Sequence, residues 1–237
     1  MSSENMTLVV TRKEIKSITR NRGLLFAGMY IGSMFGILNM ILGEQVLAID
    51  NTVFSVALLV GVFVGYSFSG SVFLREKREK IIETLLCTPL SLKSIWFGKV
   101  LGATIPAYLF SCLAVSLVIT ASSITEHTFL FPSTAILVHV LVVVPIFIAA
   151  AVSLIGFCQF LLGMRENRII GFLVVLALLP FMYPSILGGL TQGDTNVAVS
   201  WLEVEICSTF AVLLLATTTF LSRYLSKEKI VMTIPSS

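Results

Sequence analysis

Long, nearly uninterrupted runs of apolar residues limit what this chain can fold into. We identify six runs, at residues 24–42, 53–74, 100–122, 135–162, 169–190 and 205–221. A run of about 20 apolar residues is the length that a helix needs to cross the hydrocarbon core of a membrane. Backbone amides in hydrocarbon must be hydrogen-bonded within their own segment, and the alternating pattern of a membrane barrel is absent from the sequence. The runs therefore predict six transmembrane helices.

The composition excludes a water-soluble globule. Hydrophobic residues make up 56% of the 237 residues and charged residues only 12%, and the mean hydropathy is +0.97. So few polar side chains cannot cover a soluble domain of this length. We predict an all-α, polytopic membrane protein that forms one transmembrane domain over residues 1–237.

The basic residues predict the orientation in the membrane. All 16 Lys and Arg residues precede the first run, separate runs two and three, separate runs four and five, or follow the last run. The opposite loops are short and carry acidic residues but no Lys or Arg. Lys and Arg are retained on the cytoplasmic side, so we expect a multi-pass plasma-membrane protein with both termini cytoplasmic. Topology and anionic inner-leaflet lipid explain these charges, and no nucleic-acid partner is inferred.

Residues 1–23 precede the first run and lack an apolar core long enough for a cleavable signal peptide. Thr11 and Glu14 have the spacing of a helix capping box. The buried side of a helix lying in the membrane interface would consist of Leu8, Val9, Ile15 and Ile18. The alternative is a solvated basic tail that only sets the topology.

The sequence lacks the motifs of the common catalytic sites. Gly98-Lys99 is followed by Val100 and does not form a phosphate-binding loop, and no zinc-binding helix or nucleophile elbow occurs. The acidic pair Glu203 and Glu205 would point to different faces of a helix. We therefore predict a non-catalytic chain that binds neither a metal nor a cofactor itself.

A charged segment, residues 75–99, separates the second and third runs. Its apolar residues recur at helical spacing among charged neighbours; they are Ile81, Ile82, Leu85 and Leu86. Pro89 is expected to end this helix, because proline disfavours helical geometry in the residue before it. Ser91 is expected to cap the next helix, which leads into the third run. From the residues alone, the amphipathic helix either docks on a partner and transmits a push or lies on the membrane surface.

The run EKREKIIETLLCTPLS at residues 76–91, followed by Gly98-Lys99, resembles the signature segment of the type-2 permeases of ATP-binding-cassette transporters. Glu83 matches the family's glutamate, Leu85 and Leu86 its leucine pair, and Pro89 its turn proline. The basic N-terminal segment is similar to the interfacial helix that precedes span one in that family. The resemblance implies a cytoplasmic coupling helix that contacts an ATPase through Glu79, Ile82, Glu83, Leu85, Leu86 and Pro89.

The resemblance also implies partners and a function. The chain would be the permease subunit of a transporter, with a second permease copy as a homodimer or paralogue heterodimer, and with a separate cytoplasmic ATPase that holds ATP and Mg. The family and the short external loops favour export over import. One alternative is an ATP-driven membrane-remodelling or partner-release complex of the same fold. Another is a secondary transporter or channel without a nucleotide partner, which would more often carry ionisable residues near mid-span.

Polar residues inside the runs are candidates for the transport pathway, because an unpaired polar group in lipid is costly. The candidates are Asn39, Gln159 and Thr218, with His139 and the neighbouring threonines as weaker ones. The alternative is plain hydrogen bonding between helices.

The fifth run is irregular, because Pro180 and Pro184 are expected to kink or break it. Residues 180–201 are therefore a candidate for a re-entrant external gate. The alternative is an ordinary kinked helix followed by a surface loop. The Asn-Pro element that the family often carries between spans five and six is not present in residues 191–204.

Overall fold

The computed structural model describes residues 3–42, 49–79, 91–125, 127, 131–162, 164–182 and 199–224. Within these residues the chain is helical and contains no strand. The longer helices are α1 (Ser3–Arg20), α2 (Arg22–Leu42), α3 (Ile49–Ser69), α6 (Leu92–Thr125), α8 (Val144–Leu161), α9 (Met164–Leu178) and α11 (Trp201–Leu221). The shorter ones are α4 (Arg75–Arg78) and α7 (Thr134–Val138), with π-helical turns at Gly70–Leu74 and His139–Val143 and 3-10 turns at Leu179–Met182 and Ser222–Tyr224.

Four helical stretches of the described chain are long and apolar enough to cross a membrane. They are Ile49–Arg78, Leu92–Ile124, Thr134–Leu161 and Trp201–Tyr224. These stretches coincide with the second, third, fourth and sixth predicted runs, and the prediction of an all-helical membrane protein is confirmed to that extent. Helix α2 covers the first run, and the shorter apolar helix Gly171–Phe181 lies in the fifth.

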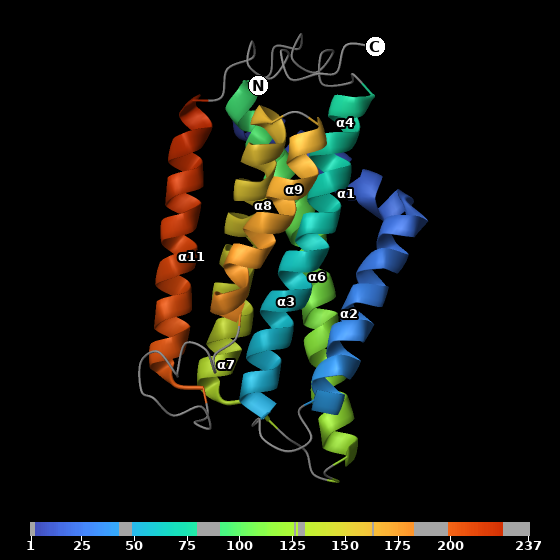
Figure 1. Cartoon of the computed structure of the whole chain (residues 1–237), viewed down its shortest axis with the longest axis vertical. Coiled ribbons are helices and arrows are strands. Elements are labelled where there is room, and N and C mark those ends of the chain that lie inside the picture. Colours follow the sequence, from blue (N-terminus) through green and yellow to red (C-terminus); the bar gives the residue numbers. More distant parts are fainter. Residues whose placement is uncertain are drawn as a thin grey trace.

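Helix α3 lies at the centre of the bundle. It packs against α2, α6 and α8, while α11 packs on the far side of α8 (Figure 1). In the most apolar part of Ile49–Arg78, 78% of the residues are buried within the protein, against 22% in Trp201–Tyr224. The core therefore surrounds α3, and helices such as α11 leave apolar side chains on the outer surface, where lipid would contact them.

Two glycines one turn apart bring α3 and α8 close together. A Cβ atom on Gly61 would overlap Ile148, and one on Gly65 would lie 2.9 Å from the Cγ2 of Val152. Small residues at this spacing let two membrane helices approach closely, which increases their van der Waals contact. The sequence pattern thus determines which face of α3 meets α8.

The charged segment joins the bundle through continuous helices at both of its described ends. Helix α3 runs through the π-helical turn Gly70–Leu74 into α4 without a break. At the other end, the Oγ of Ser91 accepts a hydrogen bond of 3.1 Å from the backbone N–H of Ser94, and α6 begins at Leu92. The prediction that Ser91 caps this helix is confirmed. Residues 80–90, with the predicted amphipathic helix and Pro89, lie outside the described residues.

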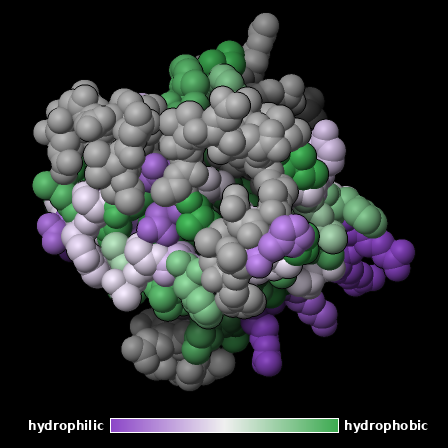
Figure 2. Space-filling model, turned by 90° about the horizontal axis from the view of Figure 1, so that it is seen from below, coloured by the Kyte–Doolittle hydropathy of each residue, from purple (hydrophilic) through white to green (hydrophobic). Residues whose placement is uncertain are grey.

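We call the end of the bundle that holds α1, α4 and the first turns of α6 the basic end. Figure 1 shows these elements at the same end as the last turn of α11. At the opposite end, Asp50 accepts a hydrogen bond of 3.1 Å from the backbone N–H of Ser133, which connects the start of α3 to the start of α7. Figure 2 shows the molecule from that end, with hydrophilic and hydrophobic side chains both present on the face that is seen.

Candidate functional site

Four charged side chains meet at the basic end, and we call them the basic-end ion cluster. Lys13 and Glu14 come from α1, Glu76 from α4, and Lys99 from the second turn of α6. Lys and Arg residues that only set the topology would not need to be buried. The structure instead buries three of these four side chains, those of Glu14, Glu76 and Lys99.

Lys99 is the centre of this cluster, and its side chain is fully buried. Its ammonium nitrogen lies 2.6 Å from the Oε2 of Glu76 and 3.1 Å from the Oε1 of Glu14, and it donates a hydrogen bond of 2.9 Å to the carbonyl of Val72. Two of these three oxygens, those of Glu14 and Val72, accept hydrogen bonds from the ammonium group, and the Glu76 carboxylate forms an ion pair with it. The ring of Phe73 lies 5.8 Å from the same nitrogen, which adds a cation–π contact. A lysine near the start of α6 is thus held by α1, by α4 and by the π-helical turn before α4.

Lys13 closes the cluster on its outer side. Its ammonium group donates a hydrogen bond of 2.8 Å to the Oε1 of Glu76 and lies 3.7 Å from the Oε1 of Glu14. Burial lowers the pKa of Lys13, but the hydrogen bond and negative charge of Glu76 outweigh this and raise the pKa above its ordinary value. The cluster contains two ammonium groups and two carboxylates, so it is electrically balanced.

The balance makes the relative positions of the helices costly to change. Buried ions lose their hydration, and they are tolerated only while their counter-charges stay in place. If α1, α4 or α6 moved away alone, Glu76 or Lys99 would remain buried with an incomplete set of partners. The cluster therefore makes these three elements move together.

Two glycines of α6 allow α1 to come close enough for this contact. A Cβ on Gly98 would lie 2.7 Å from the Cβ of Val10, and one on Gly102 would lie 2.5 Å from the Cβ of Glu14. The hydroxyl of Thr11 lies 3.2 Å from the carbonyl of Gly98, within hydrogen-bonding distance. Because any larger residue at these two positions would collide with α1, the spacing of the glycines sets the depth at which Glu14 meets Lys99.

The predicted capping box of Thr11 and Glu14 is wrong. Helix α1 begins at Ser3, so both residues lie in the middle of the helix and face α6. The same spacing of three residues places two side chains on one helical face, and a sequence pattern alone does not separate the two cases. Of the predicted apolar stripe, Ile18 is buried in the bundle, while Leu8 and Val9 are exposed on the protein surface.

Lys77 makes a second connection, to the end of α8. Its ammonium group donates hydrogen bonds to the carbonyls of Leu162, Phe160 and Gln159, at 2.7, 3.3 and 3.4 Å. Carbonyls at a helix C-terminus have no partner within the helix and carry partial negative charge, so a cation is favoured there. The fully buried Lys77 thus joins α4 to α8, a role for which the sequence offers no signal, since its partners are backbone atoms 82 or more residues away.

Of the residues predicted to contact an ATPase, the structure describes only Glu79. Glu79 is exposed at the end of α4 and accepts a hydrogen bond of 2.8 Å from the Nε of Arg75. The remaining predicted contacts, Ile82, Glu83, Leu85, Leu86 and Pro89, lie outside the described residues.

Of the predicted pathway and gate residues, the structure describes the side chains of Gln159, Thr218 and Pro180. Gln159 accepts a hydrogen bond of 3.0 Å from Ser69, which joins α8 to α3, and Ser153 donates one of 2.9 Å to Thr218, which joins α8 to α11. Both contacts are of the kind expected for hydrogen bonding between helices. Pro180 is exposed in the 3-10 turn that follows α9. The side chain of Asn39 and the whole of Pro184 lie outside the described residues.

No protein-family model matches this chain, and a search of curated proteins finds no significant match.

Proposed function

We propose that this chain is the membrane-embedded, non-catalytic permease subunit of an ATP-binding-cassette transporter, working as a dimer with a separate cytoplasmic ATPase. The single observation that carries the proposal is the attachment of the start of the charged segment to the bundle. Glu76 binds α1 and α6 through Lys13 and Lys99, and the neighbouring Lys77 binds the end of α8. A displacement of the segment would therefore reach several helices at once.

The arrangement supports transmission of a push. Helix α4 is a direct continuation of α3, the most buried helix, and the other end of the charged segment begins α6. A π-helical turn at Gly70–Leu74 lies between α3 and α4. Such turns within helices are frequent at functional sites. A force applied between residues 79 and 91 would act on α3 and α6 together, because Lys99 and Glu76 bind these helices to each other.

In the proposed mechanism, the partner ATPase holds ATP and Mg and closes on them. Closure pushes the segment from Glu79 to Pro89, tilts the helices on either side of it and alternates access to a path between two permease copies. The basic end then faces the cytoplasm, and α2 and α9 with its following turn are the first and fifth of six spans. Export is the proposed direction.

The test is coupled ATPase activity in proteoliposomes that contain this chain and the ATPase with which it co-purifies. Glu83→Ala and Leu85→Asp should each weaken the coupling by about tenfold or more, since a residue central to an interface contributes about 2 kcal/mol or more. Glu205→Ala, a matched substitution on α11 near the opposite end, should leave the coupling unchanged.

Two outcomes would contradict the proposal. One is that no ATPase with a phosphate-binding loop co-purifies with the chain. The other is that both variants insert into the membrane and keep full coupling, which would make residues 80–90 a surface segment without a partner.

A further inference from the structure

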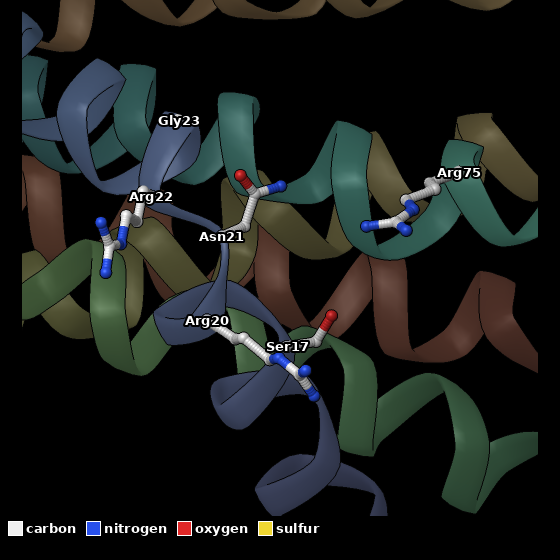
Figure 3. A pocket seen from close by; sticks show the side chains of 6 residues that line it. All are labelled: Ser17, Arg20, Asn21, Arg22, Gly23 and Arg75. Carbon is white, nitrogen blue, oxygen red and sulfur yellow. The ribbon is translucent and has the colours of Figure 1, made fainter.

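The junction between α1 and α2 contains a cleft of about 670 Å³ that the ion cluster does not use. Its lining residues are Ser17, Arg20, Asn21, Arg22, Gly23 and Arg75. Figure 3 shows Arg75 extending from α4 towards Asn21, with Ser17 and Arg20 on the α1 side of the cleft and Arg22 turned to the other side of the junction. Three of the six lining residues are arginines, and none is acidic.

The groups around this cleft are hydrogen-bond donors. The amide oxygen of Asn21 is 3.4 Å from the backbone N–H of Leu24, at the start of α2. The amide nitrogen, in Figure 3, points towards the side on which Arg75 lies. The contact of Arg75 with Glu79 uses its Nε, so the two terminal nitrogens of the guanidinium remain for another acceptor. Within the described part of the chain, Arg20 and Arg22 form no ion pair with an acidic side chain.

A cluster of this kind, in which only Arg75 has an acidic partner within the described residues, favours an anion. The guanidinium groups of Arg20 and Arg75 carry like charges on this side of the junction, and a phosphate group between them would lower their repulsion while accepting charge-assisted hydrogen bonds. Arginine is well suited to phosphate because its planar fork donates two parallel hydrogen bonds.

The position of the cleft indicates which anion. It lies where α1 ends and α2, an apolar helix of 21 residues, begins. One turn beyond Arg22, on the same face of α2, Phe26 is exposed, followed by exposed Met29 and Tyr30. The α1–α2 junction thus adjoins a helix with exposed apolar side chains, which the acyl chains of a lipid bound at the junction would contact. Basic pockets beside membrane helices are typical sites for anionic lipid headgroups.

We propose that this cleft binds the phosphate of an anionic phospholipid from the headgroup layer at the basic end, with Arg20, Arg75 and Asn21 as the main donors. The lipid joins α4 to the α1–α2 junction, on the outer side of the ion cluster. This site requires no ATPase partner, so it stands or fails separately from the proposed transport function.

The test uses the whole chain, purified in mild detergent and then exchanged into nanodiscs. The nanodiscs contain phosphatidylcholine with a minor fraction of phosphatidylglycerol. Native mass spectrometry counts the lipid molecules that stay bound to the protein. The wild-type protein should retain phosphatidylglycerol in preference to phosphatidylcholine. Arg20→Gln/Arg75→Gln should weaken that retention by about tenfold or more, because both substitutions remove charge-assisted hydrogen bonds to the phosphate.

The matched control is Arg12→Gln/Arg223→Gln, which removes the same charge from two exposed arginines that do not line the cleft. Equal losses in the two double variants would show nonspecific attraction and overturn the proposal. Equal retention of both lipids by the wild-type protein would also overturn it. A further experiment adds inorganic phosphate or glycerol phosphate to the lipid-bound protein. If either anion displaces phosphatidylglycerol at equal concentration, the cleft is a site for a soluble anion and the proposal is overturned. Unchanged thermal unfolding of the variants will show that lost binding is not lost folding.

Discussion

The basic-end ion cluster makes a quantitative prediction about Lys99. In Lys99→Met, the apolar stem is largely kept and the ammonium group is lost, which leaves Glu14 and Glu76 with only the half-exposed Lys13. Two opposite charges about 3 Å apart attract each other by about 5 kcal/mol at an effective dielectric constant of about 20. Removing one partner of a buried ion pair costs about 3–5 kcal/mol after desolvation is included. We expect a loss of about 3 kcal/mol, at the low end, because Lys13 lies 2.8 Å from Glu76 and still compensates it.

The measurement is the free energy of unfolding in detergent micelles. It is made on the wild-type protein, on Lys99→Met and on two further variants. Lys99→Met/Glu14→Gln restores the charge balance and leaves the Lys13–Glu76 pair, so its loss should fall to about 1–2 kcal/mol. Lys93→Met removes an exposed charge from the first turn of the same helix and should change stability by less than about 0.5 kcal/mol. The reasoning is refuted if Lys99→Met costs no more than Lys93→Met, or if the double variant is less stable than the single one.

Three further predictions concern the contacts around the cluster. Gly102→Leu should destabilise the protein by about 1–3 kcal/mol through overlap with α1, whereas Gly70→Leu, where a Cβ meets nothing within 4 Å, should not; equal effects on unfolding would contradict the close approach. Lys77→Met should lose about 1–2 kcal/mol of unfolding free energy, because the C-terminal carbonyls of α8 lose their cation, and an unchanged value would argue against this cap. Burial lowers the pKa of Lys13 but its bond to Glu76 raises it further, so its stabilising contribution is complete below the unfolded-state pKa and disappears as pH rises through the folded-state pKa. The difference in unfolding free energy between wild type and Lys13→Gln should therefore shrink at alkaline pH, and a constant difference would contradict that linkage.

Local features of the chain were predictable where their cause is local. Four of the six apolar runs became helices long enough to cross a membrane, because hydrocarbon leaves the backbone no partner outside its own segment. The cap at Ser91 depends only on a hydroxyl three residues before Ser94, whose backbone N–H has no partner within the helix. Pro180 lies just after the end of α9, as expected for a residue that lacks a backbone donor.

Features that depend on a distant partner were predicted poorly. Thr11 and Glu14 have the spacing of a helix start, but they serve contacts to α6 about 85 residues away. The cleft at the α1–α2 junction is lined by both Arg20 and Arg75, for which the sequence predicts only a role in topology. No pattern within one segment distinguishes a buried lysine from an exposed one on the same side of a membrane.

The sequence by itself therefore determined that the chain is helical and that it contains apolar helices long enough to cross a membrane, because hydropathy acts on each segment independently. Only the tertiary structure decided that Lys99, Glu76 and Glu14 are mutual partners and that Lys77 caps α8. The physical reason is that burying a charge is tolerated only when specific counter-charges or carbonyls arrive from other helices, and close helix packing at positions such as Gly98 and Gly102 brings them there.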